Sequence, residues 1–334
     1  MIENLYHGNG FLNMGAVIAA PFPFTVVIGA RGVGKTYGTL LDVALEHPQT
    51  FIYFRLTRAV IDLIMEPALQ PFKRINIDRQ TDIRPEYKRG LGRFYNGEQL
   101  IGYAAALSTF ANVRGFDGSD ILIMIVDEFL PEAGVTLRYN SYIALMHAYE
   151  TINRNREFEG RAPLKLLLLS NSDNIYNDII AGFGIGDDLY RMQQTGEEQL
   201  ETKKDNMLLI RPAAGMFKEE KKKTALYQIA GSEFTGVALD NRFAIETEQN
   251  IKQRPLQEYT PIAFIMGVCI YRHKSNGRYY VTTKLSGAPR MYDAVQAERR
   301  RFFRECPNVL KAYEKRRIDY ENVNVQQVFK KIYT

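Results

Sequence analysis

The sequence predicts an α/β fold built around a mainly parallel β-sheet, for three reasons. First, short unbroken apolar runs recur along roughly the first 215 residues, and such runs are typical of strands that helices cover on both faces. Second, stretches of helical character separate these runs, which favours a parallel sheet with right-handed crossovers. Third, the chain has 334 residues, 46% of them hydrophobic and 24% charged, so a sizeable buried core is expected.

The apolar runs that are expected to form the sheet are Phe24–Ile28, Phe51–Phe54, Ile101–Leu107, Ile121–Val126 and Leu164–Leu169. Residues 38–46 are expected to continue a helix after the first strand. Each run is far shorter than the ~20 apolar residues that a membrane-spanning helix needs, so no membrane partner is expected. The first residues lack the basic segment of a secretory signal. With only two cysteines in the chain, a reducing cytoplasm is the expected setting.

The segment between the first predicted strand and its helix fits the phosphate-binding pattern G-x-x-x-x-G-K-[ST]. Its glycines let backbone N–H groups wrap phosphates, and the helix presents its positive N-terminal end to the same anion. Lys35 is expected to contact the β- and γ-phosphates of ATP, and Thr36 to ligate Mg²⁺. The sequence therefore predicts a P-loop NTPase whose nucleotide-binding residues include Gly29, Ala30, Arg31, Gly32, Val33, Gly34, Lys35 and Thr36.

An acidic pair, Asp127 and Glu128, follows the run Ile121–Val126. An apolar strand that ends in aspartate is typical of a Walker B strand, in which the Asp holds the metal. Glu128 is then the natural residue to polarise the attacking water and draw off its proton. The alternative is an acidic pair that closes a surface strand, and the upstream P-loop favours the catalytic interpretation.

Small polar residues end the last of the predicted strands, at Ser170 and Asn171. Either side chain could lie near the γ-phosphate and report whether that phosphate is present. We therefore include Asn171 among the predicted nucleotide-binding residues. An ordinary turn after a buried strand is the alternative.

Sites of this kind also need arginines that neutralise charge on the transferring phosphoryl group, and a neighbouring subunit can supply one. Arg154 and Arg156 follow the helix predicted at Ser141–Ile152, outside the elements expected to build their own phosphate pocket. They are our first choice for catalytic residues that act in trans, with a solvated helix end as the alternative. Arg31 and Arg114 are weaker candidates.

The pattern of strands and helices weakens after residue 215. We interpret residues 1–215 as the ATPase domain, 216–255 as a lid or linker, and 256–334 as a C-terminal domain. In this last part, Ser275–Gly277 predicts a hairpin turn between apolar runs. Basic helices are expected from about Tyr292 to Phe303 and from Val309 to Arg317.

Basic residues gather in the C-terminal quarter of the chain. Fifteen Lys/Arg and seven Asp/Glu lie between Leu256 and Thr334, a net charge of +8, whereas the whole chain carries +5. This asymmetry predicts a polyanionic partner, DNA or RNA, for the C-terminal domain. A solvated helical face is the alternative.

Four segments carry a likeness to a known family: GARGVGKT at 29–36, FIYFRLTR at 51–58, STFANVRGFDGSD at 108–120 and TINRNRE at 151–157. The P-loop alone is generic, whereas the RG loop in the third segment and the NRNR sequence in the fourth raise the specificity. A looser likeness continues through GSEFTGVALDNRF at 231–243. Together they resemble the genome-packaging ATPases of small protein-primed tailed phages, which belong to the terminase-like group of the ASCE class of P-loop proteins.

The resemblance implies a homomeric ring, usually a pentamer, at the portal vertex of an empty capsid into which double-stranded DNA is driven. Some relatives also dock on a packaging RNA. The C-terminal domain is expected to resemble a degenerate ribonuclease-H-like nuclease. Such nucleases carry their first metal-binding acid on the opening strand, and the corresponding stretch is taken here as Cys269–His273, which has no carboxylate. We therefore expect this domain to bind nucleic acid rather than to cut it.

The expected function is an ATPase that uses ATP and Mg²⁺ to translocate double-stranded viral DNA into a preformed capsid, in the host bacterial cytoplasm. Two alternatives stay open at this point. One is another ring P-loop ATPase, such as a helicase or a conjugation or secretion motor. The other is a nucleotide-gated nucleic-acid-binding adaptor with little turnover.

Overall fold

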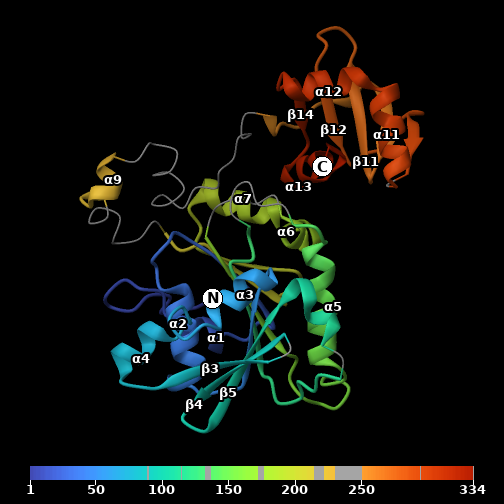
Figure 1. Cartoon of the computed structure of the whole chain (residues 1–334). Helices are drawn as coiled ribbons and strands as arrows, with labels where there is room; N and C mark the ends of the chain where they lie inside the picture. Colours follow the sequence, from blue (N-terminus) through green and yellow to red (C-terminus); the bar gives the residue numbers. More distant parts are fainter. Residues whose placement is uncertain are drawn as a thin grey trace. The chain divides into compact units, whose positions relative to one another are not determined.

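The computed structural model of the chain describes residues 1–88, 90–113, 115–131, 137–171, 177–213, 222–229, 250–293 and 295–333. The chain forms two compact units, whose elements are labelled in Figure 1. The first comprises Met1–Ile179 with Met192–Ala244, and the second comprises Ile180–Arg191 with Ile245–Thr334. This division differs from the predicted one because residues 180–191 belong with the C-terminal unit. Most of the predicted lid, 216–255, lies outside the described residues.

In the described part of the first unit, nine strands form one sheet in the order β3-β4-β5-β2-β6-β7-β1-β9-β8. The strands from β5 to β9 in this order all run parallel, whereas β3, β4 and β8 are antiparallel additions at the two edges. The strands are β1 Phe24–Ile28, β2 Phe51–Arg55, β3 Ile83–Lys88, β4 Leu91–Asn96, β5 Gln99–Ala106, β6 Ile123–Asp127, β7 Lys165–Ser170, β8 Gln199–Thr202 and β9 Met207–Ile210. The mainly parallel α/β sheet and the five predicted strands are thus confirmed, with ends that shift by one or two residues.

Helices cover both faces of this sheet. On one face, α1 to α4 share a core with alternate strand residues such as Val27, Tyr53 and Ile125. On the other face, the ring of Tyr149 in α5 packs 5.2 Å from that of Phe24. Because both faces are covered, successive strand residues are apolar. The helices that the structure describes before residue 250 are α1 Met14–Ala19, α2 Lys35–Leu41, which continues as a π-helical turn over Asp42–Glu46, α3 Arg58–Ile64, α4 Lys73–Arg79, α5 Ser141–Asn153, α6 Asp178–Phe183, α7 Gly186–Thr195 and α9 Ala225–Ile229. Of these, residues 180–191 of α6 and α7 belong to the C-terminal unit.

The C-terminal unit contains a small sheet in the order β13-β10-β11-β12-β14, with α11, α12 and α13 packed on one face. The hairpin predicted at Ser275–Gly277 is confirmed, since it joins the antiparallel strands β11 and β12. The strands are β10 Tyr259–Ile265, β11 Val268–His273, β12 Tyr279–Thr282, β13 Arg290–Tyr292 and β14 Ile318–Tyr320, and the helices are α11 Gln296–Glu305, α12 Pro307–Glu314 and α13 Val323–Tyr333.

The interpretation of Cys269–His273 as the opening strand of this domain is wrong. These residues lie in β11, the second strand, and β10 opens the sheet. The apolar run is divided at Met266 and Gly267, which take φ angles of +51° and +82° and turn the chain back on itself. A Met-Gly pair is a weak hairpin signal, because the first turn residue usually is Asn, Asp or Gly. The sequence of β10 also lacks a carboxylate.

The first residues of helix α7, up to Arg191, belong with the C-terminal unit, in which a half-buried carboxylate joins them to α13. Asp187 accepts hydrogen bonds from the backbone N–H of Val323 at 3.0 Å and from Asn324 Nδ2 at 2.9 Å. Burial raises the pKa of the Asp187 carboxyl above its ordinary value. The helix N-terminus of α13 is thereby capped by a residue more than a hundred positions upstream. In the described residues, no helix is long and apolar enough to cross a membrane.

Candidate nucleotide-binding and catalytic site

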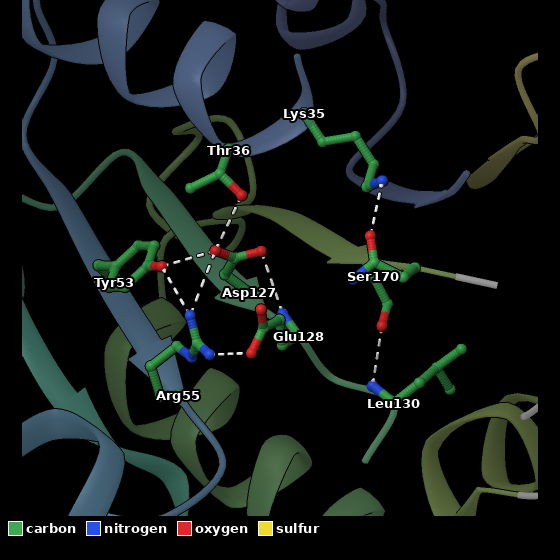
Figure 2. Close-up of polar contacts among 9 residues, drawn as sticks. Lys35, Thr36, Tyr53, Arg55, Asp127, Glu128, Leu130 and Ser170 are labelled. Carbon is green, nitrogen blue, oxygen red and sulfur yellow. Dashed lines mark hydrogen bonds and ion pairs between the residues drawn. The ribbon is translucent and has the colours of Figure 1, made fainter. Parts of the chain in front are cut away.

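The predicted phosphate-binding residues and the acidic pair come together at one edge of the large sheet, where the parallel strands β1, β2, β6 and β7 end (Figure 2). The P-loop follows β1, the acidic pair ends β6, and Asn171 follows β7. Open α/β sheets bind ligands at this carboxyl edge, because loops from neighbouring strands meet there. The topology therefore unites residues that lie up to 142 positions apart in the sequence, from Gly29 to Asn171.

Three glycines of the P-loop occupy positions that disfavour a Cβ atom, among them Gly32 with a φ of +78°. Gly34 caps α2 with a φ of +93°, a conformation that strains any residue with a Cβ atom. Gly29 has an ordinary φ, but a Cβ there would lie 2.6 Å from Pro212 Cγ. The loop can thus pack tightly against the chain after β9.

Lys35 is buried, with 7% of its surface exposed, and lies across the P-loop. Its ammonium donates to the carbonyls of Gly29 at 2.8 Å and Ala30 at 2.9 Å, and to Asn171 Oδ1 at 3.2 Å. An ammonium has three protons, so Lys35 can donate to all three of these acceptors. The contact places the Asn171 side chain next to the ammonium of Lys35.

The Asp127 carboxylate is buried and receives several donors. Oδ2 accepts from Thr36 Oγ1 at 3.0 Å and from the Tyr53 hydroxyl at 2.6 Å, and Arg55 Nη1 lies 3.6 Å away. Oδ1 accepts from the backbone N–H of Glu128 at 3.0 Å. Burial and the charge of Asp127 raise the pKa of Tyr53 well above its ordinary value, so the phenol stays protonated.

Glu128 forms an ion pair with Arg55 Nη2, which comes from the neighbouring strand β2 (Figure 2). Burial alone would lower the pKa of Arg55, but its interactions with the Tyr53 hydroxyl and with the carboxylates of Asp127 and Glu128 outweigh that effect and raise the pKa. Glu128 also has a φ of +52°, which costs a non-glycine residue about 1–2 kcal/mol. The carboxylate is therefore held beside the site by the Arg55 guanidinium and by an unusual backbone conformation.

Ser170 has a structural part in this arrangement. Its hydroxyl accepts the backbone N–H of Leu130, and its carbonyl accepts the N–H of Gly29 at 3.2 Å. The end of β7 thus joins the P-loop to the chain that leaves the Walker B strand. Of the two polar residues predicted near the γ-phosphate, Asn171 is the one whose side chain contacts Lys35.

A cavity of about 880 Å³ opens beside the P-loop, on the flank of α2. Backbone and side chains of three segments line it: the N-terminal residues around Phe11, the P-loop and first turn of α2, and the exposed side of α4. This volume is in the range of small-molecule sites, about 300–1,000 Å³. The lining includes Phe11, Gly34, Tyr37, Gly38, Arg74 and Asp78.

The two predicted trans arginines lie at the opposite edge of the sheet. Helix α5 begins at the carboxyl edge, where Ser141 N–H donates to Asp178, and ends beside the residues that lead into β6. Arg154 Nη2 donates to Phe116 O at 2.8 Å, and its Nη1 lies 3.7 Å from Asp117. Half of the Arg154 side chain is exposed.

Arg156 is buried, with 3% of its surface exposed. Its Nη2 donates to the carbonyls of Gly118 and Ser119 at 3.2 Å each and to that of Ile121. Burial lowers the pKa of its guanidinium. Arg156 therefore ties the loop after α5 to the entry of β6. Of the two weaker candidates for the arginine that acts in trans, Arg31 is exposed on the P-loop and Arg114 lies outside the described residues.

Tyr53 and Arg55 are site residues that were not predicted from the sequence. Both lie on β2 within the segment FIYFRLTR, two residues apart and therefore on one face of the strand. Polar side chains at the end of an otherwise apolar strand were the available signal. Their contacts with Asp127 and Glu128 could not be predicted from the sequence, because the order of strands in the sheet determines that β2 pairs with β6.

The chain matches the family model of the Podovirus DNA encapsidation protein (Gp16) over residues 9–284. It belongs to this family. Among its relatives, the DNA packaging protein of Bacillus phage B103 is 29% identical over 238 residues, which cover 68% of this chain and 66% of that protein. The DNA packaging protein of Bacillus phage phi29 is 25% identical over 236 residues, covering 68% and 64%. The chain thus spans just under two thirds of the length of these relatives.

Two solved structures share the fold of this Gp16-family chain. A chain of the bacteriophage Phi-29 viral genome packaging motor assembly aligns with a TM-score of 0.70 at 18% identity, over 97% of each chain. A chain of the Phi-28 gp11 DNA packaging motor aligns with a TM-score of 0.62 at 16% identity, over 97% of this chain and 96% of that one. At these identities the likeness establishes the fold.

Proposed function

We propose that the chain is an ATP-driven motor that translocates double-stranded viral DNA into a preformed capsid. One observation carries the proposal: Lys35, the Thr36–Asp127 pair and Glu128 meet at the carboxyl edge of the sheet in a chain of the DNA encapsidation family. This arrangement can hold a triphosphate, a metal and an attacking water side by side.

The residues present fit Mg-ATP. Thr36 Oγ1 and Asp127 Oδ2 are hard oxygen ligands that lie 3.0 Å apart. Among the described residues, no group of three His, Cys, Asp or Glu could hold a metal without further ligands. Mg²⁺ is usually held by one or two protein oxygens together with substrate phosphates, as this pair allows. Bound there, Mg²⁺ would neutralise charge on the β- and γ-phosphates. The nucleoside would occupy the cavity beside Phe11 and Tyr37.

Glu128 is proposed to orient the attacking water and to take its proton. Its ion pair with Arg55 must first be released or turned, because Oε2 now faces that guanidinium. Asn171, in contact with Lys35, is placed to respond when the γ-phosphate leaves. Hydrolysis would thus change contacts at the ends of β2 and β7 at the same time.

Arg154 is proposed to act in trans in a homo-oligomeric ring, which we infer to be a pentamer. Arg154 lies near the start of β6, and the metal site of the same subunit lies at the end of that strand. From Ile123 to Asp127 the strand rises by four residues at about 3.3 Å each, which separates Arg154 from this metal site by roughly 13 Å. Its exposed side chain can reach a neighbour, whereas the buried guanidinium of Arg156 cannot. We therefore propose that Arg156 holds the loop after α5 in place and so positions Arg154 for contact with a neighbouring subunit.

The proposed partners follow from the same function. The motor would act in the host bacterial cytoplasm at the portal vertex of the procapsid, with double-stranded DNA as its substrate and a packaging RNA as a further partner. The C-terminal unit would hold nucleic acid through backbone phosphates, so binding should be salt-sensitive and largely independent of sequence.

Reversing the exposed charges at the end of α12 should weaken nucleic-acid binding by the full chain. Lys315, Arg316 and Arg317 are all exposed, whereas Arg301 is engaged with Glu298 and Glu305. Changing the three to glutamate should lower affinity and reduce the slope of log affinity against log salt by about one per lost phosphate contact. Fluorescence anisotropy with duplex DNA and with RNA measures both. Reversal of the exposed Lys203 and Lys204 serves as the control, and an equal effect there would refute a specific C-terminal surface.

The proposed motor activity predicts that duplex DNA stimulates ATP hydrolysis by the wild-type chain, and that Lys35→Ala abolishes productive ATP binding. The lysine supplies three donors to the phosphate site, so its loss removes both charge and hydrogen bonds. Steady-state hydrolysis with and without DNA, and packaging into portal-bearing capsids, are the measurements. Stimulation by single strands without a capsid requirement would favour a helicase or conjugation motor, and negligible turnover would favour an adaptor.

A further inference from the structure

We propose that Tyr53 is a positioning residue for the metal site, whose buried hydroxyl fixes the Asp127 carboxylate in the orientation that it shares with Thr36. The inference rests on the proposed function, since it assigns a task within the Mg-ATP site. Tyr53 itself would touch neither nucleotide nor metal. It would act through Asp127.

The position of Tyr53 follows from the pairing of strands. β2 runs parallel to β6, with Tyr53 opposite Ile125 and Phe54 opposite Val126. Tyr53 and Ile125 share the core beneath α1 to α4, and Asp127 lies two residues beyond Ile125 on the same face of β6. The phenol therefore extends along the strand toward the end of β6. Tyr53 is 1% exposed, and solvent does not compete for its hydroxyl.

The direction of the hydrogen bond is determined by the neighbours of the hydroxyl (Figure 2). Arg55 Nη1 lies 3.4 Å from the phenol oxygen and can only donate. The single phenol proton therefore points to Asp127 Oδ2, 2.6 Å away. Donation from a guanidinium polarises the phenol and strengthens the bond that it makes in turn. Tyr53 thus connects the arginine that holds Glu128 with the aspartate of the metal site.

The two oxygens of Asp127 are held by different donors. Oδ1 accepts the N–H of Glu128 at 3.0 Å, and Oδ2 accepts the phenol. With both oxygens engaged, the carboxylate plane is fixed relative to β6. Oδ2 is then directed at Thr36 Oγ1, 3.0 Å away, which is the other protein oxygen of the proposed metal site. Without the phenol, Oδ1 would keep its bond from the N–H of Glu128, but Oδ2 would be held only loosely, by Thr36 and by an Arg55 that is itself engaged with Glu128.

A phenylalanine would satisfy the packing at this position. Phe51 and Phe54 on the same strand are completely buried, so the sheet accommodates phenyl rings here. Burying a hydroxyl is costly unless it is hydrogen-bonded, and the partner that it finds is the metal-site aspartate. Groups that hydrogen-bond a metal ligand orient that ligand, and their loss typically costs 10- to 100-fold in metal affinity or activity.

Tyr53→Phe tests the inference, with Tyr149→Phe as the matched control. Tyr149 is another largely buried tyrosine of the same unit, and its hydroxyl donates to a backbone carbonyl, Leu164 O, at 2.8 Å. Binding of a fluorescent ATP analogue to each full-length chain is measured in EDTA and during titration with Mg²⁺. We expect Tyr53→Phe to raise the half-saturating Mg²⁺ concentration about tenfold or more. Its affinity for the analogue in EDTA, and its Tm relative to the control, should be unchanged.

The outcomes separate this inference from the proposed function. If wild-type protein shows Mg²⁺-dependent binding and Tyr53→Phe has the same Mg²⁺ dependence, the role of Tyr53 is refuted and the proposed function stands. If Tyr53→Phe binds the ATP analogue equally more weakly with and without Mg²⁺ and also has a lowered Tm, the inference is refuted as well. That result would show that the hydroxyl only stabilises the fold. If the wild-type chain binds no Mg-nucleotide, the proposed function is overturned and this inference with it.

Discussion

Glu128→Gln should bind ATP with near wild-type affinity and hydrolyse it roughly 10²- to 10⁴-fold more slowly, the range that general-base catalysis contributes. Glutamine keeps the size and hydrogen-bonding reach of the side chain but cannot accept the proton of the attacking water. Lys35, Thr36 and Asp127 are untouched by the change, and their contacts with one another and with Asn171 do not involve Glu128. Binding of a fluorescent nucleotide and single-turnover hydrolysis measure the two properties separately.

The ion pair with Arg55 supplies a control for this experiment. Glu128→Gln also removes the charge that Arg55 faces, so a loss of activity could reflect disorder of that arginine rather than a missing base. Arg55→Lys retains a cation near Asp127 and Glu128 but leaves Glu128 able to accept a proton. We expect Arg55→Lys to retain far more hydrolysis than Glu128→Gln. Near wild-type turnover by Glu128→Gln would show that another group activates the water.

The central strands of the sheet could be predicted from the sequence because burial on both faces leaves a simple signal. β1, β6 and β7 are continuous apolar runs, and every residue of β6 is buried. β3 gave no such signal. It lies at the edge of the sheet, alternates buried with more exposed residues and contains Pro85. A strand with one face in solvent and a proline resembles a loop when neighbouring strands are unknown.

The site was predictable wherever chemistry is tied to a local motif. The P-loop and the acidic pair each occupy a few consecutive residues, whose spacing implies phosphate and metal binding. Tyr53 and Arg55 act on Asp127 and Glu128 only because β2 lies beside β6, and that adjacency is a property of the sheet order. Similarly, the sequence presents Arg154 and Arg156 as equivalent. Only the fold shows that one guanidinium is half exposed and the other is surrounded by backbone carbonyls.

Arg154→Ala should lower hydrolysis by roughly 10³-fold or more while ATP binding persists, because an arginine that acts in trans stabilises charge that develops in the transition state. The nucleotide contacts of the variant's own P-loop are unaffected, since Arg154 lies at the other edge of the sheet. Arg161→Ala is the matched control: its side chain is similarly exposed in the same loop and pairs with Glu159. Hydrolysis by that control should stay near the wild-type rate.

Mixing Arg154→Ala with Glu128→Gln should restore part of the activity that each variant lacks. In a mixed ring, a subunit with Arg154→Ala still has an intact Glu128, and a neighbour with Glu128→Gln can supply an intact Arg154. Each such interface forms one complete site, so activity should depend on the mixing ratio and be greatest when both variants are present. The hydrolysis rate across a series of ratios, with native mass measurements to show that mixed rings form, tests this. Absence of rescue in rings that demonstrably mix would place Arg154 in cis or outside the site, with Arg31 and Arg114 as the next candidates.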